Sequence, residues 1–257
     1  MPCTRALVRP PAANFADGLT SCNEGVPDIA LALKQHRAYC QALADCGLEI
    51  TTLPADPLHP DSTFIEDTAI VTARGAIATR PGAPSRIGEV DSVVAALRRH
   101  YNDVAQIVAP GTVDGGDVCE ADDHFLIGLS SRTNEQGARQ LAGLLADLRS
   151  TTSIVDIRGS KMLLHLKSGL AYLGNNRLVV TEDIPRVAAF SRYEQIPVRA
   201  EERYAANCVR VNDRVLVAAG YPKFADMLVA RRYDIVPIEM SEFRKMDGGL
   251  SCLSLRL

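Results

Sequence analysis

Tryptophan is absent from this sequence of 257 residues, aromatic residues make up only 5% of it, and no long uninterrupted apolar run occurs. A helix that crosses a membrane needs about 18 or more consecutive apolar residues, so we expect no membrane partner. Basic clusters are also missing, because 28 Lys and Arg are spread among 31 Asp and Glu. Nucleic-acid binding requires such clusters to displace counterions from phosphates, so we expect no nucleic acid as a partner. With 47% hydrophobic residues, the chain can nevertheless bury a large core.

Metal-binding patterns of cysteine and histidine are missing too. The seven cysteines are scattered without a Cys-x-x-Cys pair, and a structural zinc site is not expected because the five histidines lie far apart, at His36, His59, His100, His124 and His165. The first five residues lack the basic and apolar segments of a signal peptide. An odd number of cysteines without an export signal indicates reduced thiols and a cytoplasmic protein. The oligomeric state is left open, and a homodimer is compatible with the sequence.

Apolar spacing predicts an alternation of short strands and helices. Pairs of strands joined by tight turns are expected at residues 65–79, 117–129, 169–181 and 207–219, the last two with asparagine-containing turns. Helices are expected at 28–43, 87–100, 134–148 and 223–232, and single strands at 105–109, 153–157 and 233–238. A last strand at 249–257 is expected to pair with residues 6–8.

The order strand, strand, helix, strand therefore recurs along the chain, with a period of roughly 40–50 residues that is typical of radial repeats. We predict a single α/β domain over residues 1–257, a propeller of five such units with pseudo-fivefold repetition around a central active site. A doubly wound sheet is the alternative. It is disfavoured because a hairpin in every unit forces antiparallel pairing, whereas doubly wound sheets are mostly parallel.

The acids are unevenly distributed. Residues 38–73 and 100–131 each carry six acids and no Lys or Arg. Most of these acids suit solvated loops. Glu66, Asp67, Asp114 and Asp117 differ, because they stand where apolar strands begin, and in a radial sheet the strand starts point towards one end of the axis. Carboxylates gathered there suit a cation, and a pair of them can hold a planar guanidinium through two hydrogen bonds.

Cys252 and His165 also stand at predicted strand starts. Cys252 follows Gly248 and Gly249, which allow a close backbone approach. Taken alone, each is more often structural: a buried thiol in one case, a hydrogen-bonded histidine in the other. A cysteine enzyme, however, needs a thiol, an imidazole and an orienting carboxylate from distant parts of the sequence. The repeat offers a way to gather Cys252, His165 and Asp114.

With these residues the chain resembles the dimethylarginine dimethylaminohydrolases, part of the guanidino-modifying or pentein superfamily. The resemblance runs essentially from end to end, from Asp17 to Ser254. Its segments are DSTFIEDTAIV (61–71), TRPGAPSRIGE (79–89), APGTVDGGDV (109–118), SRTNEQGARQ (131–140), LHLKSGLAYL (164–173), YAANCVRVN (204–212) and RKMDGGLSCLS (244–254). It implies the five-unit α/β propeller of that superfamily.

The resemblance also implies a role for individual residues. Cys252 matches the nucleophile and His165 the general acid and base. Asp114 matches the carboxylate that orients the histidine, at a position where some bacterial members have the longer Glu. The implied substrate-binding residues are Glu66 and Asp67 for the guanidinium, Asp61 with the backbone carbonyls of Leu19 and Met246 for the α-amine, and Arg86 and Arg132 for the α-carboxylate.

The reaction that the resemblance implies is hydrolysis of Nω,Nω-dimethyl-L-arginine or Nω-monomethyl-L-arginine to L-citrulline and dimethylamine or methylamine. It proceeds through a covalent S-alkylthiouronium on Cys252, with no metal and no cofactor. Hydrolysis of free arginine or agmatine is the nearest alternative. Agmatine has no carboxylate for Arg86 and Arg132 to bind, and arginine deiminases usually carry a large helical insertion. A propeller without activity, which binds arginine-like ligands or a protein partner, is an alternative of another class.

Overall fold

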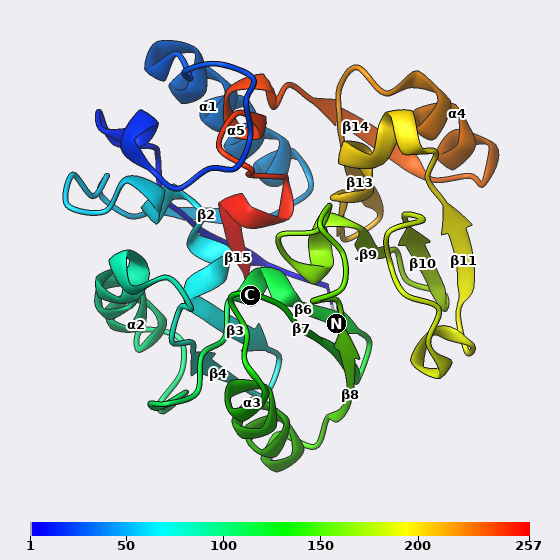
Figure 1. Cartoon of the computed structure of the whole chain (residues 1–257). Helices are drawn as coiled ribbons and strands as arrows, with labels where there is room; N and C mark the ends of the chain where they lie inside the picture. The colour runs from blue at the N-terminus through cyan, green and yellow to red at the C-terminus, as the bar shows by residue number, and fades with distance from the viewer. Residues whose placement is uncertain (1) are drawn as a thin grey trace. The chain divides into compact units, whose positions relative to one another are not determined.

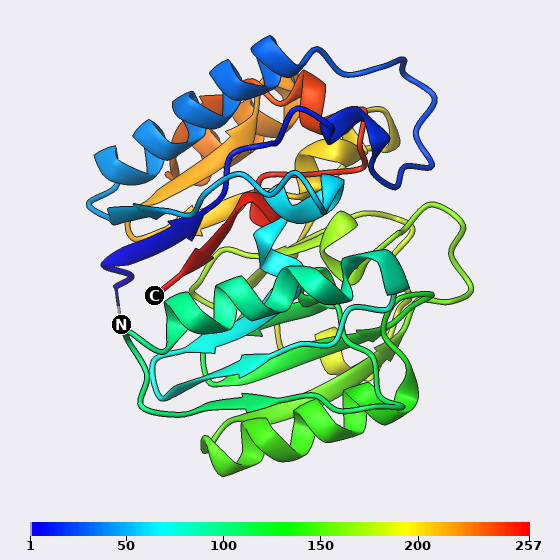
Figure 2. The same cartoon turned by 90° about the vertical axis from the view of Figure 1, so that its left-hand side faces the viewer.

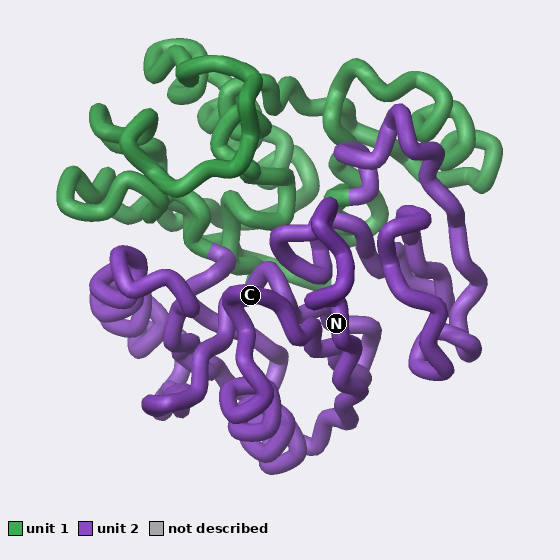
Figure 3. Tube along the Cα trace, in the orientation of Figure 1, with its two compact units in different colours: residues 1–65, 207–257 green, residues 66–206 purple. Residues whose placement is uncertain are grey.

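The structure, a computed structural model, describes residues 2–257. Within that range the strands form five separate three-stranded sheets. The chain divides into two compact units, one made of residues 1–65 and 207–257 and the other of residues 66–206, drawn in green and purple in Figure 3.

The first unit holds two of the sheets. In one, β1 pairs antiparallel with β15, with Ala6 opposite Arg256, and parallel with β2; Figure 2 shows β1 in dark blue beside β15 in red. This confirms the predicted pairing of residues 6–8 with the last strand. The elements of this unit are β1 (Arg5–Val8), α1 (Ile29–Asp45), β2 (Glu49–Thr52), β12 (Val209–Val211), β13 (Arg214–Ala218), α4 (Pro222–Ala230), β14 (Asp234–Ile238), α5 (Ser241–Arg244) and β15 (Ser254–Arg256).

The second unit holds the other three sheets, each a hairpin followed by a third strand parallel to the second (Figure 1). Helices connect the last two strands in two of the sheets. The elements are β3 (Ala69–Thr72), β4 (Gly75–Ala78), α2 (Val90–Leu97), β5 (Val104–Gln106), β6 (Val118–Ala121), β7 (His124–Leu129), α3 (Glu135–Asp147), β8 (Thr151–Asp156), β9 (Leu170–Tyr172), β10 (Arg177–Val180) and β11 (Glu194–Pro197).

Helix α3 illustrates how sequence pattern sets the packing. The Asn134 side chain accepts a hydrogen bond from the Gly137 N–H at 2.8 Å and so begins the helix. Leu141 and Leu145 lie four residues apart on one face and are fully buried in a cluster with Phe125 of β7. Each such leucine contributes about 1.5–3 kcal/mol by leaving water. The helix packs against β7 and β8 and so fixes its place on this sheet.

The predicted turns are confirmed, because Asn175, Asn176 and Asn212 adopt positive φ angles of 52°, 56° and 54° in the tight hairpins. Three details differ from the prediction. No α-helix lies between β10 and β11, where the chain makes only a short 3₁₀ turn at Ala188–Phe190. The strands β2 and β11 and the short helix α5 were not predicted. Residues 65–68 and 251–253 form 3₁₀ turns and not strands.

Within residues 2–257, five repeats of three strands are therefore confirmed, and in four of them an α-helix connects the last two strands. The expectation of a single domain over residues 1–257 stays a prediction. Within residues 2–257, no helix combines the length and the apolar character that crossing a membrane requires.

Candidate active site

A short 3₁₀ turn precedes the first strand of every repeat, and half of the candidate site residues lie on these turns or begin them. Glu66 and Asp67 lie on η3 (Ile65–Thr68), and Cys252 lies on η9 (Ser251–Leu253). Asp114 and His165 are the residues that begin η5 (Gly115–Asp117) and η6 (Leu166–Ser168). The turn η8 (Ala200–Ala206) precedes the remaining repeat. The strand starts that the sequence singles out are thus real and structurally equivalent.

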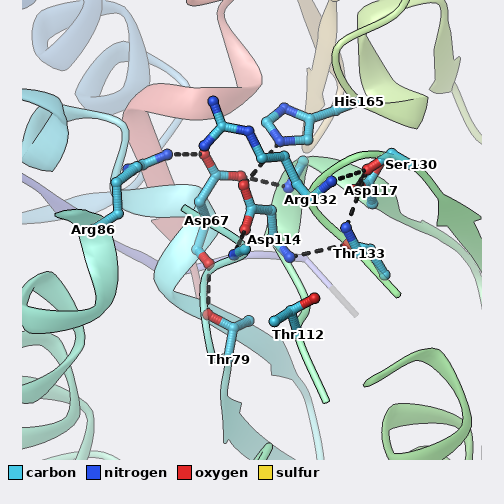
Figure 4. A network of polar contacts seen from close by, with 12 residues as sticks. Asp67, Thr79, Arg86, Thr112, Asp114, Asp117, Ser130, Arg132, Thr133 and His165 are labelled. Atoms are coloured by element: carbon cyan, nitrogen blue, oxygen red, sulfur yellow. Dashed lines mark hydrogen bonds and ion pairs between the residues drawn. The ribbon is translucent and has the colours of Figure 1, made fainter. Parts of the chain in front are cut away.

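In the second unit, His165 meets two buried carboxylates (Figure 4). Its Nε2 lies 3.0 Å from Oδ2 of Asp114, whose Oδ1 accepts the Gly82 N–H at 2.8 Å. Oδ1 of Asp67 accepts the Gly116 N–H at 2.7 Å. Asp114 is fully buried, and Asp67 and His165 are almost so. These hydrogen bonds fix the orientation of both carboxylates towards the imidazole.

The charges of this cluster stabilise one another. Burial by itself would lower the pKa of His165, but the negative charges of Asp67 and Asp117, with the hydrogen bond to Asp114, raise it to about 9. Burial would raise the pKa of Asp67, and the positive charges of His165 and Arg86 outweigh it and lower that pKa to about 2. At neutral pH His165 is therefore an imidazolium and Asp67 a carboxylate.

Arg86, which in the sequence looks like an ordinary surface charge, is 5% exposed. Its Nη1 lies 2.6 Å from Oδ2 of Asp67, and its Nε and Nη2 bond the Glu89 carboxylate at 3.0 and 2.8 Å. Burial lowers the pKa of Arg86, but Asp67 and Glu89 raise it well above its ordinary value. The guanidinium that was expected to bind a substrate carboxylate is here held by two protein carboxylates, with which a substrate would compete.

Glu66 has a cation of its own. Its Oε1 lies 2.6 Å from Nζ of Lys167, two residues after His165, and both side chains are largely buried. Both acids of the Glu66–Asp67 pair are thus ion-paired within the second unit, one with lysine and one with arginine. The two carboxylates are therefore not equivalent, and Asp67 is the one adjacent to the imidazole.

Arg132, the other predicted carboxylate binder, is held by its backbone. Its N–H donates to Oγ of Ser130 at 2.9 Å, and the residue is partly exposed. Within residues 2–257 no ion pair engages its guanidinium. Of the two predicted arginines, Arg132 is the one whose charge is not already neutralised.

The first unit carries the thiol. The Gly249 N–H points at Sγ of Cys252, 3.4 Å away, and Cys252 is partly exposed, unlike the buried Cys208. Asn207 holds this turn, because its Oδ1 accepts the Ser251 N–H at 2.9 Å and its Nδ2 donates to Oγ of Ser251 at 3.1 Å. A Cβ on Gly249 would lie 2.5 Å from the Asn207 side chain. This close approach is the reason for the glycine that the sequence predicts.

The residues predicted to bind the α-amine also belong to the first unit. Asp61 is 5% exposed, and its two carboxylate oxygens accept the Leu19 N–H at 3.1 and 3.2 Å. A Cβ on Gly18 would lie 2.4 Å from Oδ1 of Asp61 and 3.2 Å from Cε of Met246. The structure therefore brings together the three predicted segments around Asp61, Leu19 and Met246.

Asp67, Asp114 and His165 each offer a donor atom, all within 4.8 Å of one another, which is a geometry that could hold a metal ion. The buried Arg86 guanidinium beside Asp67 repels the concentrated charge of a divalent metal ion more strongly than a guanidinium, whose single charge is spread over three nitrogens, and backbone N–H groups already bond both carboxylates. A planar guanidinium suits this arrangement of acceptors better. The expectation that no metal is needed stays a prediction.

Gly116 sets the spacing inside this cluster, since a Cβ there would lie 2.7 Å from Nδ1 of His165 and 3.0 Å from Oδ1 of Asp67. The change Gly116→Ala is expected to displace the buried imidazole and to lower kcat by about 10²-fold. Gly143→Ala is the control, because Gly143 lies in α3 with open space around its Cβ position, and it should leave kcat unchanged. Equal kcat in both variants and the parent would contradict this account of Gly116.

Four residues that shape the site lie outside the predicted set, namely Glu89, Lys167, Ser130 and Asn207. Lys167 and Glu89 stand within three residues of His165 and Arg86, so a search for opposite charges next to each candidate would have found them. No such local signal marks Ser130 and Asn207, whose partners are distant in sequence or depend on the shape of a turn.

Comparison with known proteins identifies the family of the chain. The family model for arginine deiminase matches residues 37–202. The chain is 45% identical to the N(G),N(G)-dimethylarginine dimethylaminohydrolase of Pseudomonas aeruginosa, over 97% of this chain and 98% of the relative.

Two solved structures show the likeness in three dimensions. A cysteine-to-serine mutant of the dimethylarginine dimethylaminohydrolase of Pseudomonas aeruginosa, complexed with citrulline, has a TM-score of 0.96 and 43% identity and covers 100% of both chains. A histidine-to-glycine variant of a dimethylarginine dimethylaminohydrolase, an adduct with S-methyl-L-thiocitrulline, has a TM-score of 0.95 and 44% identity and covers 99% of this chain and 100% of that one. These matches confirm the predicted five-unit α/β propeller. The chain belongs to the dimethylarginine dimethylaminohydrolase family and, with it, to the group of proteins that the arginine deiminase model describes.

Proposed function

We propose that this chain hydrolyses Nω,Nω-dimethyl-L-arginine and Nω-monomethyl-L-arginine to L-citrulline, with release of dimethylamine or methylamine. The observation that carries the proposal is the buried imidazolium of His165 between the carboxylates of Asp67 and Asp114, in a chain 45% identical to a dimethylarginine dimethylaminohydrolase. The cysteine-to-serine mutant that binds citrulline and the adduct of the histidine-to-glycine variant support it.

Asp67 and Asp114 are the groups that orient the guanidinium. A guanidinium is a poor electrophile because resonance spreads its charge over three nitrogens. Charge-assisted hydrogen bonds from these nitrogens to fixed carboxylates hold the central carbon in one position. The low pKa of Asp67 keeps its carboxylate ionised throughout the neutral range, and Glu66 adds a further acceptor beside it.

Cys252 is the nucleophile of this proposal. Its thiolate adds to the guanidinium carbon to form a tetrahedral intermediate. The His165 imidazolium then protonates the nitrogen that carries the methyl groups, the C–N bond breaks, and an S-alkylthiouronium remains on sulfur. The neutral imidazole next takes a proton from water, whose oxygen attacks the same carbon. The C–S bond breaks, which restores the Cys252 thiolate, and the hydroxyl proton passes to solvent as the carbonyl forms and citrulline leaves.

The Gly249 N–H at 3.4 Å from Sγ supports a thiolate at Cys252, because it donates to the sulfur. A histidine with a pKa of about 9 is protonated at neutral pH, as the first proton transfer requires. It returns to that form when it takes the proton from water, so one residue serves both steps.

The remaining residues select an α-amino acid. Asp61, with the carbonyls of Leu19 and Met246, would bind the α-amine, and Arg132 offers the α-carboxylate a guanidinium that no ion pair within residues 2–257 engages. Arg86 can bind the α-carboxylate of the substrate only if its guanidinium gives up a hydrogen bond to Asp67 or Glu89.

The arginine deiminase model match favours free arginine as a second candidate substrate. The test incubates the protein with equal concentrations of dimethylarginine, monomethylarginine, arginine and agmatine and measures citrulline, carbamoylputrescine and the released amine. We expect citrulline from the two methylated arginines and little product from agmatine, which has no α-carboxylate. Equal turnover of arginine and the methylated forms would contradict the proposed substrate, and no turnover of any of the four would contradict the reaction.

The location and assembly remain proposals. None of the seven cysteines, all within residues 2–257, is in a disulfide, which supports a cytoplasmic location. The absence of membrane and nucleic-acid partners and the compatibility with a homodimer stay predictions from the sequence.

A further inference from the structure

Asp117 is a fully buried acid in the second unit for which the reaction above has no use. It ends η5, three residues after Asp114. Its Oδ1 accepts the Leu166 N–H at 2.9 Å, and its Oδ2 accepts the hydroxyl proton of Ser130 at 2.6 Å. Leu166 is the neighbour of His165, so this carboxylate binds the backbone at the base of the imidazole.

The contact with Ser130 extends to two further site segments (Figure 4). Oγ of Ser130 accepts the N–H groups of Arg132 and Thr133 at 2.9 and 3.1 Å. Oγ1 of Thr133 in turn accepts the Asp114 N–H at 3.1 Å. A continuous set of hydrogen bonds therefore starts at Asp117 and reaches the segments that carry His165, Arg132 and Asp114.

This network requires a carboxylate at position 117. The Ser130 oxygen already accepts two N–H groups, so its single proton must be donated, and only an acceptor can face it. The Leu166 N–H on the other side needs an acceptor too. Asparagine has the same shape but offers only one acceptor, and either orientation of its amide sets a donor against a donor. The loss is unavoidable because the site is buried and water cannot replace the missing acceptor.

We propose that Asp117 is a positioning residue for the hydrolysis, which holds the His165 turn and the Arg132 segment in fixed relation through its two carboxylate oxygens. The proposal rests on the proposed function for its effect on turnover, but not for its effect on His165. Gly128 supports it, because a Cβ there would lie 3.1 Å from Oδ1 of Asp117 and so would crowd the carboxylate.

The charge of Asp117 affects the pKa of His165, a measurable quantity that a merely structural role of Asp117 would leave unchanged. The acidic groups facing His165 are Asp67, Asp114 and Asp117, and the charges of Asp67 and Asp117 help to raise its pKa. Burial raises the pKa of Asp117 itself to about 6, against the lowering effect of His165 and of its hydrogen bonds. Above that pH Asp117 is charged. Two cations of the cluster, Arg86 and Lys167, are paired with Asp67 and Glu66.

The experiment compares Asp117→Asn, Ser130→Ala and the control Asp103→Asn, an exposed acid of the same unit. NMR of histidine-labelled protein follows the His165 titration, and steady-state kinetics with dimethylarginine give kcat and KM. In Asp117→Asn the midpoint of the His165 titration should move to lower pH and kcat should fall about 10- to 100-fold. In Ser130→Ala, which keeps the carboxylate, the titration should stay near that of the parent and KM should rise several-fold. The control should change nothing.

The proposal is overturned if Asp117→Asn unfolds at a lower temperature but keeps the parent's titration midpoint of His165 and the parent's kcat for dimethylarginine. Should that variant fail to fold, Ser130→Ala decides: a raised KM with kcat largely kept supports the positioning role, and an unchanged KM refutes it. If the parent itself does not turn over methylated arginines, the proposed function fails. The NMR titration of Asp117→Asn then still tests the contact with His165.

Discussion

The change Cys252→Ser is expected to lower turnover of dimethylarginine by at least about 10⁴-fold, with citrulline and dimethylamine as the measured products. A serine hydroxyl stays protonated at neutral pH. The Gly249 N–H, which donates to the sulfur of Cys252, is too weak a donor to convert that hydroxyl into an alkoxide. Binding should survive, because the substitution is nearly isosteric and removes none of the carboxylates. We expect the dissociation constant of citrulline, measured by calorimetry, to change less than 10-fold.

Quenching the parent with acid during turnover should trap the intermediate as a mass adduct on the peptide that contains Cys252. The control is Cys46→Ser, another partly exposed thiol of the first unit, at the C-terminal end of α1, which should retain activity and the adduct. Dimethylamine release that persists in Cys252→Ser would remove Cys252 from the mechanism. An adduct found on another cysteine would identify that cysteine as the nucleophile.

The change Arg86→Met is expected to reduce the free energy of unfolding by about 3–5 kcal/mol, because it leaves the buried carboxylates of Asp67 and Glu89 without their shared cation. Urea denaturation measures this loss. Arg132→Met should change stability by less than about 0.5 kcal/mol, since its guanidinium has no ion pair within residues 2–257 and is partly exposed. Its effect should instead be a raised KM.

The pH dependence of the Arg86→Met effect identifies its cause. Asp67 has a folded-state pKa lowered to about 2 from its ordinary 3.8, so its ionisation contributes stability above the unfolded value and loses it as the pH falls towards 2. The stability difference between parent and Arg86→Met should therefore be largest at neutral pH and shrink in acid. A difference that is constant between pH 7 and pH 3 would attribute the loss to packing of the side chain and not to charge.

The success of the sequence prediction depended on how local each signal was. Hairpin turns are local, and asparagines such as Asn212 marked them. Strand starts are local as well, and they led to Asp67, Asp114 and His165. Ion pairing is not local: the sequence shows how many charges there are but not which of them meet, so the burial of Arg86 between Asp67 and Glu89 was not foreseen. The missing helix between β10 and β11 has another reason. The repeating order of strands and helices predicts a helix in every unit, but one unit of the structure lacks it.

The pairing of β15 with β1 bears on when the proposed nucleophile becomes ordered. Cys252 lies two residues before β15 begins, and that strand is held by residues at the opposite end of the sequence, with Ala6 opposite Arg256. Contacts between residues so far apart form late in folding, because closing a long loop costs entropy before any contact compensates for it. A partly folded molecule would therefore contain the thiol without a fixed place for it. Enzymatic activity should therefore appear only when β15 pairs with β1, and partly folded molecules should be inactive.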